Sequence, residues 1–299
     1  MGFHHVSVLL NETTDALHPV DGGTYVDCTL GGGGHSERLL SMADCTVIGL
    51  DRDADAIAAA SERLARFGDR FRPVRTTFAE LPGALASLGL GQVDGLMADF
   101  GVSSHQLDID ERGFSFRRSG PIDMRMDGDA ELSAATLVNE ASEEELGRIV
   151  RDYGEERRWR RVARTLVDGR PWTDTVELSS AIEKAVGGKH ERIHKATRSF
   201  QGLRIAVNDE LGQVERLLPA AVQAVRPGGR LAFIAFHSLE DRLVKRFFYA
   251  ESGRTGSKDA YGNPTAAVRL QGIRLIRPQE DDPNPRARSA RLRTATRCP

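Results

Sequence analysis

Apolar and polar positions along the first hundred residues follow the pattern of strands joined by helices. Short apolar runs at 24–30, 45–51, 71–78 and 93–101 predict buried strands, with a helical pattern in each gap between them. The alanine-rich helix after the second run begins behind Asp53, a residue type that caps helices. Short strands separated by helices predict a parallel α/β sheet with right-handed crossovers.

This alternation stops between about residues 105 and 206, where no convincing buried strand is found and helical patterns follow an irregular stretch. It resumes with an amphipathic helix, a Pro-Gly-Gly turn and a fifth strand at 230–237. Two more strand candidates lie near 269–277 and 289–296. We therefore predict an α/β domain of residues 1–104 and 207–299, and an inserted, mainly helical domain of residues 105–206.

Composition narrows the class of protein further. The 299 residues are 40% hydrophobic and 28% charged, as in soluble globular proteins. The net charge is −2, so a nucleic acid would have to bind a local basic surface. No apolar run is long enough to predict a membrane span, and the N-terminus lacks the pattern of a signal peptide. We expect a cytoplasmic protein.

Cysteine and histidine spacing predicts neither a disulfide framework nor a metal site. The chain has three cysteines, which form no CxxC pair, and Cys28 and Cys45 are expected in the core. Several histidines share no metal-ligand spacing, so no metal is predicted. These are His4, His5, His18, His190 and His194.

Four consecutive glycines, 31–34, stand between the first strand and the next helix. No Gly-Lys-Ser/Thr follows them, as a P-loop would require, and Ser36 occupies the third glycine position of a dinucleotide fingerprint. Asp27 precedes the glycines, and Asp51 ends the second strand. A carboxylate at that place can accept hydrogen bonds from both hydroxyls of a ribose. With the Pro-Gly-Gly before the fifth strand, these features resemble Rossmann-like S-adenosylmethionine-dependent methyltransferases. A dinucleotide site and a turn without a ligand remain alternatives.

Asp99 lies at the carboxyl end of the fourth strand, the edge at which α/β sheets bind ligands. In amine methyltransferases this position presents a polar group to the target nitrogen, so Asp99 is our candidate for that contact. A turn or cap carboxylate is the structural alternative. At the end of the fifth strand, a group of polar residues suits a pocket wall and a helix start equally well: His237, Ser238, Glu240 and Asp241.

Three segments are rich in arginine: 112–127, 155–167 and 284–297. Cations interleaved with aromatic residues suit phosphates and unstacked bases. An ordinary loop would explain the first segment and a solvated helix face the second, while the third contains no compensating acids.

Taken together, these segments resemble the bacterial small-subunit ribosomal RNA cytosine-N4 methyltransferase family. "GPIDMRMD" and "FHSLEDR" are the most distinctive matches, and the resemblance covers residues 5 to 293 in order. The other matching stretches are "HVSVLLNE", "DCTLGGGGHS", "GLDRDADAI", "DFGVSSHQLD", "RGFSFR", "YGEER", "ATRSFQGLRIAVNDEL", "PGGRLAFIAFHSLEDR" and "NPRARSARLR". The resemblance implies a Rossmann-like fold with a helical insertion. It also implies methylation of the N4 amino group of a cytosine in the decoding centre, with S-adenosyl-L-methionine as cofactor.

The resemblance also implies a set of cofactor-binding residues. Asp51 would bind the ribose, Phe78 would pack near the adenine, and the glycines with His35 would hold the methionine end. Two flanking positions depart from the family, since His105 and Lys195 stand where prolines are usual, which puts loop rigidity in doubt. The complete implied set is Gly33, Gly34, His35, Asp51, Phe78, Asp99 and Gln106.

The expected mechanism is direct methyl transfer to N4. The N4 lone pair is delocalised into the ring, so catalysis would come from alignment and from an acceptor for an amino hydrogen, supplied by Asp99 or a neighbouring carbonyl. The base would be splayed out of the RNA for the reaction. The expected partner is small-subunit ribosomal RNA within the assembled 30S subunit. A homodimer is left open. The alternatives are an RNA-binding assembly factor with an inactive pocket, and a dehydrogenase.

Overall fold

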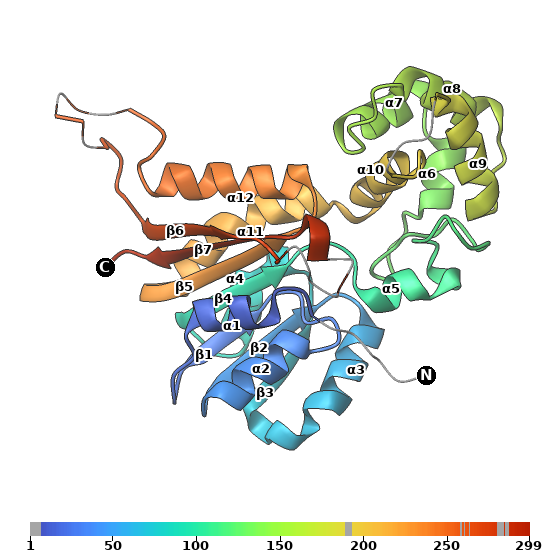
Figure 1. Ribbon diagram of the computed structural model, residues 1–299. Helices are drawn as coiled ribbons and strands as arrows, with labels where there is room; N and C mark the ends of the chain where they lie inside the picture. The colour runs from blue at the N-terminus through green and yellow to red at the C-terminus, as the bar shows by residue number, and fades with distance from the viewer. Residues whose placement is uncertain are drawn as a thin grey trace. The chain divides into compact units, whose positions relative to one another are not determined.

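The protein is described by a computed structural model (Figure 1). The chain forms two compact units. The sheet unit comprises the chain up to Gly101 and Leu211–Pro299, and the helical unit comprises Val102–Glu210. The helical unit thus begins and ends a few residues outside the insertion predicted at 105–206. The structure describes residues 7–188, 193–257, 259, 261–262, 264–279, 284 and 287–299, without the side chains of Ser104 and His105.

Among the described residues of the sheet unit, seven strands form one sheet in the order β3-β2-β1-β4-β5-β7-β6. The first five are parallel, and β7 and β6 are antiparallel to their neighbours. The strand order reverses beside β1, which lies between β2 and β4, and ligands of such sheets bind at this reversal. The strands are β1 (Thr24–Asp27), β2 (Thr46–Asp51), β3 (Phe71–Arg75), β4 (Val93–Asp99), β5 (Val225–Ala235), β6 (Leu270–Ile276) and β7 (Arg291–Arg297).

Helices cover both faces of the sheet, which explains the nearly continuous apolar strands. Val26 and Ile48 point to the face packed by α4, α11 and α12, and Tyr25 and Val47 point to the face packed by α1, α2 and α3. Figure 1 shows the strands lying between these helical layers. The helices are α1 (Leu10–Leu17), α2 (Gly34–Met42), α3 (Ala54–Leu64), α4 (Leu81–Ser87), α11 (Glu210–Ala224) and α12 (Ser238–Glu251), with short 3-10 turns η1 (Ala65–Arg70), η2 (Phe78–Glu80) and η4 (Ala287–Ser289).

Local details confirm some predictions and correct others. Asp53 caps α3 by accepting from the backbone N–H of Asp55, and Cys28 and Cys45 are buried, as predicted. The first strand ends at Asp27 and not at 30, because the chain turns away into the glycine loop. Its hydrophobic pattern could not reveal this early turn, since the turn residues are themselves buried.

The sheet beyond β4 differs more from the sequence pattern. The predicted Pro-Gly-Gly turn lies inside β5, where the pairing with β4 shifts register and Gly228 has a φ of 80°. β7 runs antiparallel to both of its neighbours, β5 and β6, which the hydrophobic period of the sequence does not reveal. The helix expected to run from 207 is interrupted at Asp209, whose φ is 48°; α10 ends before it and α11 begins after it.

The helical unit, as far as described, contains no strand, in agreement with the sequence. Its core combines residues at helical spacing, such as Leu146 and Val150 on α7 and Val162 and Leu166 on α8. Side-chain caps begin three of its helices, from Ser133, Ser142 and Asp174. Its helices are α5 (Ser104–Asp108), η3 (Asp110–Arg112), α6 (Ala134–Glu140), α7 (Glu143–Asp152), α8 (Trp159–Asp168), α9 (Thr175–Val186) and α10 (Thr197–Asn208).

The distinctive "GPIDMRMD" motif is part of this core. Met124 and Met126 are buried, and the side chain of Asn208 bonds the backbone of both, accepting from the Met126 N–H at 2.8 Å and donating to the Met124 carbonyl at 2.7 Å. Arg125 forms a bidentate pair with Asp123. The motif is therefore explained by folding of the helical unit. No helix of the described chain is long and apolar enough to cross a membrane.

Candidate active site

Carboxylates end three neighbouring strands of the sheet unit. Asp27 ends β1, Asp51 ends β2 and Asp99 ends β4. Because these strands are parallel and adjacent, their carboxyl ends lie at one edge, beside the reversal of strand order. The structure thus brings together the acids that the sequence singled out.

The glycine loop packs tightly against its own chain. Gly31 and Gly33 have φ values of 48° and 75°, which favour glycine, and Gly33 caps α2. A Cβ on Gly34 would overlap with Oγ of Ser7. A Cβ on Gly33 would lie 3.1 Å from a methyl of Leu64 on α3. A side chain at position 34 would therefore force Ser7 to move, and one at position 33 would be strained by the left-handed backbone.

Asp51 anchors this loop. One carboxylate oxygen accepts from the Gly31 N–H at 2.8 Å, and the other accepts from the Asp53 N–H at 2.9 Å. Burial raises the pKa of Asp51, while the two hydrogen bonds act in the opposite direction. Each carboxylate oxygen can accept two hydrogen bonds, so Asp51 retains acceptor capacity for a ribose diol.

Asp27 is fully buried, and both of its carboxylate oxygens accept hydrogen bonds from residues of the sheet unit. One oxygen accepts from the Ser36 hydroxyl at 2.8 Å, and the other accepts from the Thr29 N–H at 3.2 Å. Burial raises the pKa of Asp27 to about 6, although both hydrogen bonds oppose this. Asp27 therefore ties the end of β1 to α2. This also gives Ser36, at the third fingerprint position, a structural role.

Asp99 differs from both of its neighbours. Its Oδ1 is buried and has no hydrogen-bond partner among the described residues. Its backbone N–H donates to the hydroxyl of Thr29 at 2.6 Å, which holds the end of β4 against the loop after β1. Burial raises the pKa of Asp99 well above its ordinary range, and the charges of Asp27 and Glu240 add to this effect. A buried, unpaired acceptor is costly unless a ligand supplies a donor.

Thr29 is the residue that sequence reasoning missed at this site. It lies two residues beyond Asp27 and connects Asp27 to Asp99 through its own N–H and its hydroxyl. The only signal available in the sequence was its position between the first strand and the glycines.

The remaining predicted site residues lie in different surroundings. The Nε2 of buried His35 is 3.2 Å from the carbonyl of Val8, so its ring packs against the start of the chain. Phe78 is half-buried with its ring 5.8 Å from that of Phe100. Gln106 belongs to the helical unit, where its side-chain oxygen accepts from the Ser103 N–H at 3.0 Å. Their contacts to a cofactor stay predictions.

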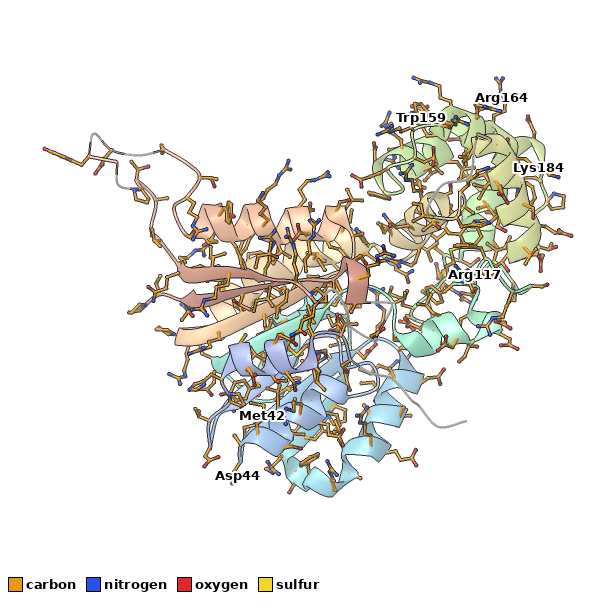
Figure 2. The ribbon with its side chains drawn as sticks, viewed as in Figure 1. Met42, Asp44, Arg117, Trp159, Arg164 and Lys184 are labelled. Atoms are coloured by element: carbon orange, nitrogen blue, oxygen red, sulfur yellow. The ribbon has the colours of Figure 1, made fainter. Side chains whose placement is uncertain are left out.

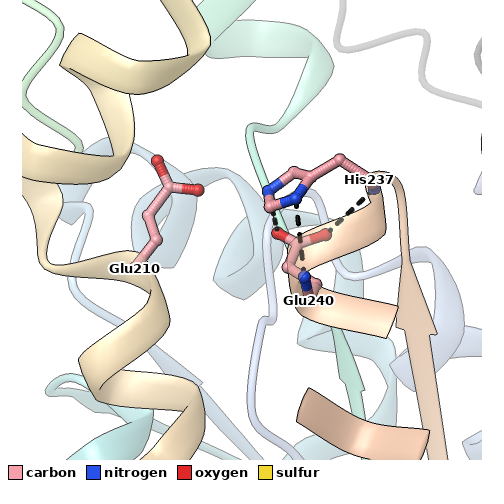
Figure 3. A group of neighbouring side chains, drawn as sticks. All are labelled: Glu210, His237 and Glu240. Carbon is pink, nitrogen blue, oxygen red and sulfur yellow. Dashed lines mark hydrogen bonds and ion pairs between the residues drawn. The ribbon is translucent and has the colours of Figure 1, made fainter. Parts of the chain in front are cut away.

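His237 and Glu240 form the start of α12 (Figure 3). His237 is the N-cap, and the Glu240 carboxylate bonds back to its N–H in a capping box, with the imidazole Nε2 3.1 Å from Glu240 Oε1. The helix-start interpretation is therefore correct, with His237 and not Ser238 as the cap. His237 and Ser238 also line a cavity of about 840 Å³, together with Arg277, Arg288 and other residues after β6.

The basic segments divide into paired and exposed arginines. In the first, Arg112 donates to backbone carbonyls and Arg118 pairs with Asp110 at 2.7 Å, as expected of an ordinary loop. In the third, Arg291 and Arg293 donate to Asp241 of α12 at 2.8 and 2.6 Å. The third segment contains no acid of its own, as its sequence shows, and Asp241 of α12 supplies the compensating charge.

Two family prolines are replaced, and some predicted positions fall on residues without a description. Lys195 donates to the Gly188 carbonyl at 3.1 Å and lies 3.8 Å from Glu183, so its side chain contacts the end of α9. The following lie outside the described residues: His4, His5, His190 and the side chain of His105.

Comparison with known proteins identifies the family to which this arrangement belongs. The model of the MraW methylase family matches residues 2–298. The chain belongs to the MraW methylase family.

Relatives of this MraW-family chain cover almost its whole length. It is 49% identical to ribosomal RNA small subunit methyltransferase H of Trichlorobacter lovleyi, with 98% of each chain covered. It is 48% identical to the protein of the same name from Carboxydothermus hydrogenoformans, covering 99% of this chain and 98% of the relative. Among solved structures, an rRNA methylase from Streptococcus thermophilus covers 99% of this chain and 100% of its own, with a TM-score of 0.47 and 9% identity, too low to carry an argument.

Proposed function

We propose that this protein is an S-adenosylmethionine-dependent methyltransferase that methylates the N4 amino group of a cytosine in the decoding centre of small-subunit ribosomal RNA. Membership of a methylase family and relatives named for this RNA support the substrate. The observation that carries the chemistry is Asp99, whose buried Oδ1 has no partner in the described structure. An amino group is a donor that would satisfy it.

The strand-end residues fit the cofactor. Adenosylmethionine, when bound, supplies an electrophilic sulfonium methyl group. Asp51 retains lone pairs for the ribose hydroxyls, and Phe78 offers a half-buried ring for the adenine. Gly33, Gly34 and His35 would hold the methionine end, and Asp99 and Gln106 complete the proposed set.

Asp99 would act on the target amine during transfer. Its carboxylate would accept a hydrogen bond from the N4 amino group, which orients the lone pair as the bond from N4 to the methyl group forms and the bond from the methyl group to the sulfonium sulfur breaks, leaving a thioether. The carboxylate would then take the proton that the methylated nitrogen loses. This role requires the ionised form. Because burial and the neighbouring acids raise its pKa, the free enzyme should gain activity as pH rises.

The helical unit would bind the RNA. Figure 2 shows Trp159, Arg164 and Lys184 on its surface, and Arg157, Arg160 and Arg161 are also exposed. Arg160 stacks on the Trp159 ring at 4.2 Å. Arg158 is exposed too, but it donates to the carbonyl of Val186 and so has a structural role. Replacing the exposed trio Arg157, Arg160 and Arg161 should therefore flatten the salt dependence of binding more than replacing Arg158.

The proposed substrate is the assembled 30S subunit in the cytoplasm, and the protein acts there as a monomer or homodimer. The decoding-centre cytosine is displayed by surrounding folded RNA, so assembled subunits should be methylated faster than protein-free RNA. The test is tritium transfer from labelled adenosylmethionine into both substrates, followed by nucleoside analysis. Label on the cytosine amino group supports the proposal. Label on a ring carbon, or no label, contradicts it, and faster labelling of naked RNA contradicts the assembled substrate.

A further inference from the structure

Helix α12 begins beside the candidate active site. Its first residue, Ser238, follows the end of β5 by three residues, and β5 pairs with β4 at the level of Asp99, opposite Ile234. A group on the first turns of α12 therefore belongs to the same end of the sheet as Asp99. In Figure 2, nitrogen-tipped side chains extend from the outward side of this helix.

The outward face of α12 is basic. Arg242, Lys245, Arg246 and Tyr249 follow the spacing i, i+3, i+4 and i+7, which places them on one side of a helix. The three cations are exposed and Tyr249 is half-buried. Arg254, just beyond the helix, is also exposed, and it and Lys245 lie 5.2 and 5.7 Å from the Tyr249 ring. We call these five residues the α12 basic face.

The opposite side of α12 is packed against the sheet. Val244 and Phe248 are 1% and 0% exposed and belong to the sheet core. Asp241 accepts from Arg291 and Arg293 of β7, and these contacts hold the pKa of Asp241 below its usual range even though burial acts to raise it. The rotation of the helix about its axis is therefore determined, and the basic face stays outward.

Two of the three acids of α12 pair with cations outside this face, and the third caps the helix. Glu240 caps the helix while 1% exposed, Asp241 is bound to β7, and Glu251 pairs with Arg269 at 2.6 Å. Lys245 and Arg246 have no ion pair within the described chain. Like charges three or four residues apart destabilise a helix slightly, so helix stability does not account for this arrangement. Binding of a polyanionic partner would account for it.

We propose that the α12 basic face binds the phosphate backbone of the nucleotides that flank the target cytosine. This inference rests on the proposed function and adds a contact surface in the sheet unit to the one proposed on the helical unit. Residues 242–249 span about 10 Å of helix axis, enough for two or three phosphates. Cations at fixed positions contact phosphates regardless of base, so this surface would position the strand while other groups select the cytosine.

The test compares two double variants of the full-length protein that remove the same charge. Lys245→Ala with Arg246→Ala removes the centre of the basic face. Arg38→Ala with Arg72→Ala removes two exposed arginines on α2 and β3, far along the sheet order from β5. Binding to protein-free small-subunit ribosomal RNA and to 30S subunits is measured from 50 to 300 mM KCl, with calorimetry of adenosylmethionine binding and thermal unfolding as folding controls.

We expect the α12 variant to bind both RNAs about tenfold more weakly near 150 mM salt and to flatten the salt slope by about 1.5, because about 0.7 to 0.9 of slope is lost per phosphate contact. The control variant should match the wild type, and all three proteins should bind adenosylmethionine equally. An unchanged slope, or equal losses in the control, would overturn the proposal. Binding to phosphatidylglycerol vesicles is measured for the same proteins. If the α12 variant loses vesicle binding but keeps RNA binding, the face binds a membrane and the proposal is overturned. If the wild type labels no RNA, the proposed function fails instead.

Discussion

The strand ends of the sheet unit and the 109–133 segment of the helical unit are both dense in polar groups, yet they use them differently. In the helical segment, Arg125 pairs with Asp123, Arg112 bonds carbonyls and Asn208 bonds the backbone of Met124 and Met126. At the strand ends, Asp99 keeps a buried oxygen without a described partner. A distinctive motif whose groups are satisfied serves the fold, whereas an unsatisfied buried acceptor indicates a ligand.

The same contrast separates two carboxylates of the sheet unit. Asp27 is fully buried but receives two hydrogen bonds, and Asp99 receives none on Oδ1. Both have raised pKa values because of burial. A raised pKa therefore does not distinguish a structural acid from a functional one, whereas a buried oxygen without a described hydrogen-bond partner indicates a ligand contact.

The largest expected effect is on Asp99. Asp99→Ala should lower kcat by about 100- to 1,000-fold, as for loss of a group that contacts the reacting centre. Asp99→Asn, which keeps the shape, should also lose most of the activity. The measurement is single-turnover methyl transfer with saturating adenosylmethionine, beside calorimetry of cofactor binding. Equal losses of turnover and cofactor affinity would make Asp99 a cofactor ligand only.

The pH dependence of kcat/KM of the wild-type enzyme is a second test of the role of Asp99. Since the active form is ionised and the pKa is raised, kcat/KM should increase with pH through that raised pKa. A profile that is flat from pH 6 to 9 would contradict the carboxylate role.

The next effect concerns Asp27 and the pH dependence of stability. The folded protein binds a proton at Asp27 up to about pH 6, whereas the unfolded chain releases it near 3.8, so this contribution is present at low pH and is lost as pH rises from about 4 to 6. One pKa unit corresponds to about 1.4 kcal/mol, so the loss should be about 3 kcal/mol. Asp27→Asn should remove it.

Urea unfolding of both proteins between pH 4 and 7 checks this. The free energy of unfolding of the variant, relative to the wild type, should increase with pH over that range. A constant difference would mean that Asp27 titrates normally.

Asn208 tests the structural side of the comparison. Asn208→Ala leaves the Met126 N–H and the Met124 carbonyl buried without their partner, so the free energy of unfolding should fall by about 2–3 kcal/mol. Adenosylmethionine affinity should stay within about twofold of the wild type, because Asn208 serves the helical core. Chemical denaturation and calorimetry measure the two quantities. A large loss of affinity in a stable variant would place the motif in the site.

The smallest effect is on Thr29. Thr29→Val keeps the shape but removes the hydroxyl that accepts the Asp99 N–H, and turnover should fall about tenfold, corresponding to loss of one hydrogen bond. Thr29→Ser should restore most of it. The split between kcat and KM identifies the cause, since misplacement of Asp99 lowers kcat at unchanged cofactor affinity. No rescue by serine would show that the methyl group matters instead.

Much of the fold could be predicted because its signals are local. Apolar runs revealed the five parallel strands, and Asp53 revealed the start of α3. The reversed direction of β7 and the break at Asp209 were not predictable, because the hydrophobic period of a strand is the same in either direction and a single left-handed residue leaves the helical period intact. Asp241 as the partner of Arg291 and Arg293 was missed for a similar reason, since 50 residues separate it from the first of them.

The sequence by itself determined the class of this protein: it placed Asp51 and Asp99 at one edge of the sheet, because parallel strands joined by helices align their carboxyl ends. The structure added Asp27, since β1 ends there and not at residue 30. It also determined family membership, through motifs spread over the whole chain. Only the tertiary structure decided which polar groups form hydrogen bonds within the folded chain. Hydrogen bonds form between residues distant in sequence, so Ser36 could satisfy Asp27, Asn208 could satisfy the methionine motif, and Asp99 alone among the three strand-end acids was left with a buried oxygen lacking a described partner.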